Sequence, residues 1–256
     1  MKDILFISPN NARKIYQNLS TKYSAIEPPT WALLLSQSCR SKGYSVSILD
    51  CLAENLSIEE AYSRIIDLNP KIICFVVYGQ NVNAGTTNMS GATELSNFLK
   101  QKGLMQPICF IGSHVQALPI DTLRNEKSID VTFCNEGVYS LWNFLKLEKY
   151  EKEDLKKIKG IAFRAKNEII INEPEQIVPQ DRMDIDLPGY AWDLLPKKNK
   201  PLDLYRSPMW HAEYDQNKRS PYAALQTSLG CQFRCDFCMI NIINRNDNDE
   251  VGVSSN

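Results

Sequence analysis

Lys71-Ile-Ile-Cys-Phe-Val-Val77 is an apolar run with none of the polar alternation of a strand that has one face in water. Strands of parallel sheets are covered by helices on both faces, so their sequences are continuously apolar. Asn69-Pro70 precedes the run, and the residue before a proline is biased away from helix. The run therefore predicts the central strand of a parallel sheet.

Strand and helix patterns alternate on both sides of this run, up to residue 147. The predicted strands are 3–8, 45–50, 107–111 and 131–134, and the predicted helices are 31–42, 57–68, 89–102 and 137–147. Strands separated by helices of this length are joined by right-handed crossovers. We predict that residues 1–147 form an α/β domain, a doubly wound and Rossmann-like parallel sheet of five strands.

The composition changes after this domain. Residues 146–159 are dense in Lys and Glu and predict a solvated linker. Two short apolar segments at 161–164 and 168–172 predict a β-hairpin within a connector that covers residues 148–221. The rest of the connector, from Pro174, is rich in Pro, Asp and Lys, with isolated aromatic residues. Residues 222–228 predict one more strand, at the start of a third segment that covers 222–256.

The overall composition argues against several classes of partner. The formal net charge is -1, and 43% of the 256 residues are hydrophobic. Nothing here predicts binding to nucleic acid or to an anionic membrane surface. There is no apolar stretch of about 18 residues, as a membrane span requires, and no secretory signal pattern before the first strand. We therefore expect a cytoplasmic protein, whose singly scattered cysteines are buried thiols.

Three cysteines are clustered near the last predicted strand. Leu229-Gly-Cys231-Gln-Phe-Arg-Cys235-Asp-Phe-Cys238 spaces them as C-x3-C-x2-C. Thiolates are the ligands of iron–sulfur clusters, and three of them leave one iron of a 4Fe-4S cluster open. Structural zinc needs a fourth ligand, and the nearest histidine, His211, has the wrong spacing. A redox pair of Cys235 and Cys238 is the other alternative.

This motif resembles that of the radical S-adenosylmethionine (SAM) superfamily, in which an aromatic residue such as Phe237 precedes the last cysteine. The resemblance implies that Cys231, Cys235 and Cys238 hold a 4Fe-4S cluster at the start of a (β/α) barrel, that SAM chelates the open iron, and that Phe237 flanks SAM. An external donor such as flavodoxin or ferredoxin would supply the electron that cleaves SAM to a 5′-deoxyadenosyl radical, which abstracts hydrogen from a small-molecule substrate.

A doubly wound sheet binds its ligand beyond the carboxyl ends of its strands. The predicted loops there are 8–11, 78–81, 112–115 and 135–137. The first strand is not followed by a G-x-G-x-x-G motif, which disfavours a dinucleotide, and there is no Walker-type loop.

Pro28-Pro-Thr-Trp-Ala-Leu-Leu34, Gly112-Ser-His114 and Glu136-Gly137 together resemble the cobalamin-binding subfamily of radical SAM proteins. Their connector motif resembles Asp186-Leu-Pro-Gly-Tyr-Ala-Trp-Asp193. The resemblance implies cobalamin contacts from Ser8, Asn10, Tyr78, Gly79, Gln80, Gly112, Ser113, His114, Glu136 and Gly137. In other cobalamin proteins an Asp-x-His-x-x-Gly loop supplies a lower-face histidine, but residues 8–18 contain none. A degenerate domain that holds no cofactor, with His114 bonded to backbone, is the alternative.

Only 18 residues follow the last cysteine, and Asn241 to Asn256 form a polar segment. We therefore expect an incomplete barrel, completed by a separate chain or lost by truncation, and little turnover by this polypeptide alone. The leading hypothesis is a cobalamin-dependent radical SAM enzyme that catalyses methyl transfer, cyclisation or rearrangement. The alternative is a non-catalytic cobalamin-binding module or an inactive fragment with a vestigial cluster loop.

Overall fold

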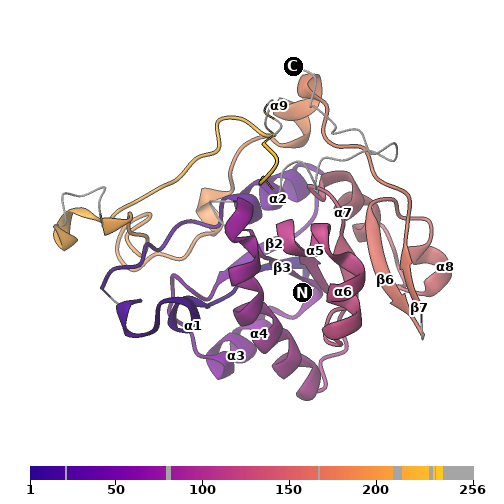
Figure 1. Cartoon of the computed structure of the whole chain (residues 1–256), viewed down its shortest axis with the longest axis horizontal. Coiled ribbons are helices and arrows are strands. Elements are labelled where there is room, and N and C mark those ends of the chain that lie inside the picture. Colours follow the sequence, from indigo (N-terminus) through magenta and orange to yellow (C-terminus); the bar gives the residue numbers. More distant parts are fainter. Residues whose placement is uncertain are drawn as a thin grey trace.

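The computed structural model of the protein describes residues 1–20, 22–78, 82–166, 168–209, 215–230, 233 and 235–238. These residues form one seven-stranded sheet in the order β2-β1-β3-β4-β5-β6-β7 (Figure 1). The strands are β1 (Lys2–Ser8), β2 (Val46–Asp50), β3 (Pro70–Val76), β4 (Ile108–Ile111), β5 (Val131–Phe133), β6 (Ile161–Ala165) and β7 (Glu168–Ile171). The first five are parallel, which confirms the predicted α/β class.

The hairpin of β6 and β7 extends the sheet, whereas the sequence had placed it in the connector. β6 pairs antiparallel with β5, with Val131 opposite Phe163. An open edge at β5 would leave unpaired backbone groups, and the apolar residues of β6 continue the core, with Ile161 and Phe163 fully buried. Five parallel strands and an antiparallel hairpin therefore share one sheet.

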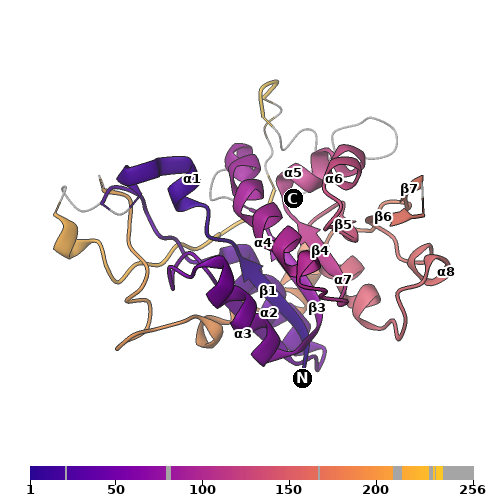
Figure 2. The same cartoon turned by 90° about the horizontal axis from the view of Figure 1, so that it is seen from below.

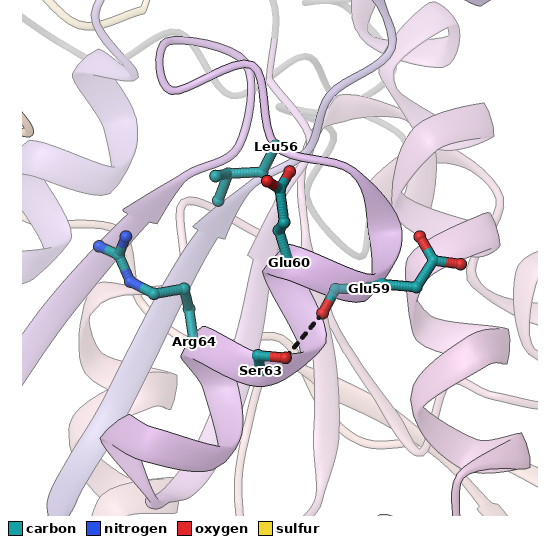
Figure 3. A pocket seen from close by; sticks show the side chains of 5 residues that line it. All are labelled: Leu56, Glu59, Glu60, Ser63 and Arg64. Carbon is teal, nitrogen blue, oxygen red and sulfur yellow. Dashed lines mark hydrogen bonds between the residues drawn. The ribbon is translucent and has the colours of Figure 1, made fainter.

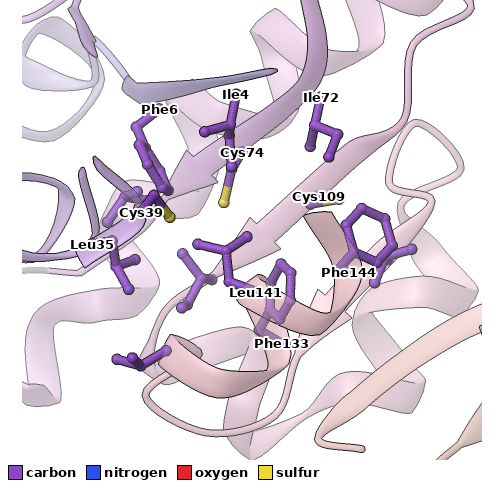
Figure 4. Packing of buried hydrophobic residues seen from close by; sticks show 14 of the residues in the cluster. Ile4, Phe6, Leu35, Cys39, Ile72, Cys74, Cys109, Phe133, Leu141 and Phe144 are labelled. Atoms are coloured by element: carbon purple, nitrogen blue, oxygen red, sulfur yellow. The ribbon is translucent and has the colours of Figure 1, made fainter. Parts of the chain in front are cut away.

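Both faces of the sheet carry a hydrophobic core, as the continuous apolar strands require. Alternate residues point to opposite faces. Phe6 and Cys74 join the cluster on one face, shown in Figure 4, and Leu5 and Phe75 join the cluster on the other. Cys39, Cys74 and Cys109 are fully buried within the first cluster, and burial raises the pKa of each thiol.

Helices cover both faces of the sheet (Figures 1 and 2). α2 (Thr30–Ser41) and α7 (Val138–Leu145) pack on one face. The other face is covered by four helices, α3 (Ile58–Leu68), α4 (Met89–Gln101), α5 (Ser113–Ala117) and α6 (Pro119–Asn125). The remaining helical segments are α1 (Ala12–Tyr16), α8 (Lys152–Leu155), α9 (Met183–Asp186) and the short 3-10 turns Gln17–Leu19, Val82–Asn88, Gln180–Arg182, Trp192–Leu194 and Gln216–Lys218.

Most predicted elements are confirmed, including the capping box in which Ser57 and Glu60 bond each other's backbone at the start of α3. The crossover after β4 was not predicted as helical. It consists of α5 and α6, which are separated at Leu118-Pro119 and are too short to show a helical period. No described helix has the length and hydropathy of a transmembrane segment.

The predicted strand at 222–228 is wrong, because these residues form no strand in the structure. A strand needs a hydrogen-bonded neighbour, and the described residues offer none to this segment. The segment instead runs in an extended path beside α2 (Figure 1), where Tyr222 packs against a small core cluster that includes Leu33 and Tyr205.

Candidate functional site at the carboxyl edge

The crevice of the sheet lies between β1 and β3, where the chain reverses its direction of winding. The crossover from β1 to β2 runs through α2 on one face, and the crossover from β2 to β3 runs through α3 on the other. The loops after β1 and β3 therefore diverge, and a ligand of a doubly wound sheet binds between such loops. Ser8 ends β1 and Tyr78 follows β3, so both predicted contacts border this crevice.

The side chains of the loop after β1 are held by internal hydrogen bonds. The Ser8 hydroxyl bonds the buried carboxylate of Asp50 at the end of β2. The Asn10 amide donates to the carbonyl of Leu56 at 3.4 Å. Ser8 and Asn10 therefore shape the loop, and its backbone is what remains to face a ligand.

Trp31, Tyr78 and Glu136 form a cluster, here called the edge cluster, on the α2 side of the crevice. The rings of Trp31 and Tyr78 are 5.5 Å apart, and the Trp31 indole donates to the Glu136 carbonyl at 3.1 Å. The Glu136 carboxylate accepts from the backbone of Val178. Burial raises the pKa of Glu136 to about 7 despite that hydrogen bond, and it also raises the pKa of Tyr78. The resemblance predicted Tyr78 and Glu136 but not Trp31.

The loop after β3 is fixed by two asparagines that the sequence did not single out. The Asn88 amide donates to the Tyr78 carbonyl at 2.8 Å, and the Asn11 amide donates to the Asn88 side-chain oxygen. Gly91 lets α4 approach the loop after β1, because a Cβ atom there would lie 2.7 Å from the Asn10 carbonyl oxygen. Gly79 and Gln80, the other predicted contacts in this loop, lie outside the described residues.

The loop after β4 forms the far side of the edge. Gly112 lies against β3, where a Cβ atom would be 2.5 Å from the carbonyl oxygen of Val77, and Ser113 is fully buried. His114 Nδ1 and Thr86 Oγ1 are 3.0 Å apart. Burial lowers the pKa of His114, which favours the neutral imidazole. The described partner of His114 is thus a side-chain hydroxyl, whereas the alternative had named the backbone; contact of His114 with a cofactor stays a prediction.

Gly137 is left-handed at φ 85° and begins α7, and its N–H bonds Asn135 Oδ1 at 2.7 Å. A Cβ atom there would lie 2.1 Å from the end of the Ile111 side chain, and the left-handed backbone itself favours glycine. The loops after β1, β3, β4 and β5 thus meet at one edge, and every predicted edge residue that the structure describes lies there.

Asp50, at the end of β2, bonds a residue from the distant connector. The hydroxyl of the fully buried Tyr205 donates to Asp50 Oδ2 at 2.9 Å, and the Ala53 N–H donates to Oδ1 at 3.1 Å. Burial raises the pKa of Asp50 to about 6, although these hydrogen bonds lower it in part. In dinucleotide-binding domains an acidic residue at this place bonds a ribose hydroxyl. Here Tyr205 occupies that position, which agrees with the missing dinucleotide motif.

The cysteine loop is described in part. Cys235 is exposed, Cys238 is half-buried, and the Cys238 N–H donates to the Cys235 carbonyl at 3.0 Å, so a tight turn links the two. Phe237 is 86% exposed and Phe233 is 64% exposed. Cys231 and His211 lie outside the described residues. Among the described residues no three potential ligands converge on a metal, so the three-thiolate site stays a prediction.

The segment before the cysteine loop runs towards the carboxyl edge. Leu229 packs against the core cluster that contains Trp31 and Val138, the first residue of α7. Further back, Tyr190 OH lies 3.1 Å from the Gln226 carbonyl and accepts from the Gln226 N–H at 2.8 Å. The segment before the cysteine motif is therefore attached to the domain through the core cluster and through Tyr190.

A shallow depression at the start of α3 is a separate feature (Figure 3). Its polar groups are already engaged: Ser63 donates to the Glu59 carbonyl at 3.0 Å, Glu60 caps Ser57, and Arg64 lies 3.2 Å from Glu54. None of the predicted site residues lines it, so it is not a candidate for the functional site.

Residues 19–144 match the family model of the B12 binding domain. The chain contains a B12-binding domain. An uncharacterized methyltransferase, PH0819 of Pyrococcus horikoshii, is 27% identical over 211 residues, which are 82% of this chain and 40% of the relative. The chain thus spans well under half the length of this relative.

Solved structures share the fold of the B12-binding domain and its connector. The cobalamin-dependent SAM radical enzyme OxsB, with aqua-cobalamin and SAM bound, has a TM-score of 0.56 at 15% identity, over 76% of this chain and 24% of that one. The radical SAM methyltransferase TsrM from Kitasatospora setae, with cobalamin and a [4Fe-4S] cluster bound, has a TM-score of 0.53 at 14% identity, over 69% of this chain and 30% of that one.

Proposed function

We propose that this chain binds cobalamin at the carboxyl edge of its sheet and a SAM-binding 4Fe-4S cluster on Cys231, Cys235 and Cys238, as part of a cobalamin-dependent radical SAM enzyme. The observation that carries the proposal is the packing of Leu229 on the core that also contains Trp31. This packing ties the segment before the cysteine motif to the same domain as the B12-binding loops, and we infer that it brings the motif to their edge. Two cofactors bound there would face one cavity.

The carboxyl edge suits a large, amide-rich ligand such as a corrin. The loops after β1 and β3 are braced by Asn11 and Asn88 and packed closely through Gly91. Residues 8–18 contain no histidine, so this loop would leave the lower face of the corrin without a histidine ligand. Tyr78 offers the ligand a partly buried aromatic surface beside the crevice.

The chemistry of the cysteine motif suits an iron–sulfur cluster. Cys235 is exposed and Cys238 is half-buried, and both lie on one turn; thiolates are the usual ligands of such clusters. The exposed rings of Phe233 and Phe237 would shield a cluster from water on one side. We place Phe237 beside SAM on the strength of the family motif.

When bound, the cluster and SAM supply a carbon radical, and cobalamin supplies a methyl group or a redox-active cobalt. The chain's own residues have other tasks. The edge cluster would hold one side of the corrin, since Trp31 fixes the Glu136 backbone and packs against Tyr78. The half-buried carboxyl of Glu136, with a pKa of about 7, can carry a proton near neutral pH. Methyl transfer, cyclisation and rearrangement of a small-molecule substrate all fit this arrangement, with an external one-electron donor such as flavodoxin or ferredoxin.

Anaerobic reconstitution with iron, sulfide and hydroxocobalamin tests the proposal. We expect about four irons and four sulfides per chain, a corrin absorption that stays with the protein through gel filtration, and a reduced-cluster EPR signal that changes when SAM is added. A folded protein that retains neither iron nor corrin would refute the proposal.

A cobalamin-binding module without SAM chemistry is the second candidate. It is favoured by the extent of the family match, which ends at residue 144, before the cysteines. Corrin binding together with a cluster signal that SAM leaves unchanged would support this second function.

A further inference from the structure

The segment that leads into the cysteine motif has few polar anchors. Within residues 222–230, the hydrogen bonds that the structure describes to the rest of the chain are those between Tyr190 and Gln226. One phenol hydroxyl thus bonds both backbone groups of a residue five positions before Cys231. The other described contacts of this segment are apolar packing by Tyr222 and Leu229.

Tyr190 is itself firmly placed on the B12-binding domain. Four residues earlier, the buried carboxylate of Asp186 accepts hydrogen bonds from Tyr139 on α7 at 2.8 Å and from Lys42 next to α2 at 3.3 Å. One residue later, the Ala191 N–H donates to the Leu33 carbonyl on α2 at 3.3 Å. The Tyr190 ring also packs on Trp192, with centroids 5.2 Å apart. The hydroxyl is therefore held at a fixed place relative to both helices that border the edge.

We propose that Tyr190 is a positioning residue, whose hydroxyl sets the distance and orientation of the cysteine motif relative to the carboxyl edge. This role rests on the proposed function, since it matters only if cofactors occupy both places. Apolar contacts of Leu229 bring the segment to the edge but are not directional. A pair of hydrogen bonds to one backbone residue is directional and fixes the path of the chain towards Cys231.

The test compares Tyr190→Phe with Tyr222→Phe in the full chain. Both changes remove one hydroxyl and keep the ring. Tyr222 lies in the same segment and packs in the same small cluster, but no hydrogen bond is described for its hydroxyl. A hydrogen bond contributes about 0.5–1.5 kcal/mol net, so we expect roughly two- to tenfold faster hydrogen exchange at the Gln226 amide of Y190F and no change there in Y222F.

The functional measurement is the magnetic interaction between cob(II)alamin and the reduced cluster, read as relaxation enhancement of the cobalt EPR signal. This interaction depends steeply on the distance between the cofactors. A variant that is merely less stable, but still binds both cofactors, would keep that distance unchanged. We expect wild type and Y222F to agree, and Y190F to show a weaker or more widely distributed interaction. An unchanged interaction in Y190F, with both cofactors bound, would overturn this role for Tyr190 alone.

If the wild-type protein binds no cluster or no cobalamin, the proposed function fails and this role fails with it. The exchange measurement then still reports whether Tyr190 tethers the segment. The two failures are therefore distinguishable.

Discussion

Replacing Asp50 by Asn should stabilise the protein near and above neutral pH. The Asp50 carboxyl is fully buried, and burial raises its pKa from 3.8 to about 6. Because the pKa of Asp50 is higher in the folded than in the unfolded state, the protonated carboxyl stabilises the fold fully below pH 3.8. This stabilisation is lost as the pH rises through 6. Each pKa unit is worth about 1.4 kcal/mol, so ionised Asp50 destabilises the wild-type fold by about 3 kcal/mol at high pH.

Asparagine keeps the acceptor oxygen for the Ala53 N–H and offers an amide group to the Tyr205 hydroxyl, but carries no charge. We therefore expect D50N to be more stable than wild type by up to about 3 kcal/mol at about pH 8, and by less than about 1 kcal/mol at about pH 4. Urea unfolding curves of both proteins at the two pH values give these differences, because other titrating groups cancel between the variants.

Asp193→Asn is the matched control. Asp193 is an exposed carboxylate, and its hydrogen bond with Arg40 lowers its pKa. D193N should therefore change stability little, and with the opposite dependence on pH. The reasoning about Asp50 is wrong if D50N and wild type are equally stable at about pH 8, or if their difference does not depend on pH.

Three further predictions concern the candidate site. Gly91→Ala places a Cβ atom 2.7 Å from the Asn10 carbonyl oxygen. The change should lower the free energy of unfolding in urea by about 1–3 kcal/mol and weaken retention of hydroxocobalamin. Full retention would exclude this contact from the corrin site. Glu136→Gln should reduce the loss of stability that wild type shows as the pH rises from 5 through 7, because the raised pKa of Glu136, about 7, favours its protonated carboxyl. The part of the loss that comes from Asp50 should remain, and parallel pH profiles of the two proteins would contradict the prediction. Cys235→Ala should abolish bound iron and sulfide without changing the melting temperature of the B12-binding domain. Cys134 is a half-buried thiol outside the motif, so Cys134→Ala should retain the iron and sulfide. Equal cluster content in both variants would exclude Cys235 as a ligand.

The fold of the B12-binding domain was predictable because its strands are buried on both faces. A continuously apolar run such as Lys71–Val77 is typical of a strand that is covered on both faces. The helices between such runs have recognisable starts, as at Ser57. The hairpin was also predictable as a hairpin. Its place in the sheet was not, because pairing between β5 and β6 depends on an open edge that no local pattern reports.

The predicted strand at 222–228 shows the limit of local propensity. Its aromatic and apolar residues suit a strand, but a strand forms only when a partner is hydrogen-bonded beside it. In the structure this segment instead bonds the hydroxyl of Tyr190 and packs against a cluster that includes Leu33 of α2. Neither contact is visible in the sequence, since the partners lie more than 30 residues apart.

The candidate site was predictable as a set of loops but not as a set of contacts. Tyr78 and Glu136 were named from a family pattern, while Trp31, which joins them through its ring and its indole N–H, was quoted only as part of a motif. Asn11 and Asn88 left no signal, because asparagines in loops are common. Conversely, the side chains of Ser8 and Asn10 bond partners within the protein. The tertiary structure determines these partners, so the sequence alone could not predict them.

The connector explains how one chain could bring two kinds of cofactor chemistry together. A flexible linker after β7 would leave the cysteines free to sample many positions. The structure instead fixes the connector at three separated points: Asp186 on α2 and α7, Tyr205 on Asp50, and Tyr190 on Gln226. Burial by itself would raise the pKa of Asp186, but hydrogen bonds from Arg182, Tyr139 and Lys42 outweigh it and keep the carboxylate charged. Because each point also contacts the B12-binding domain or the segment before the cysteines, folded structure sets the path of the connector as far as Gln226, and the proposed chemistry between two cofactors would require such a fixed path.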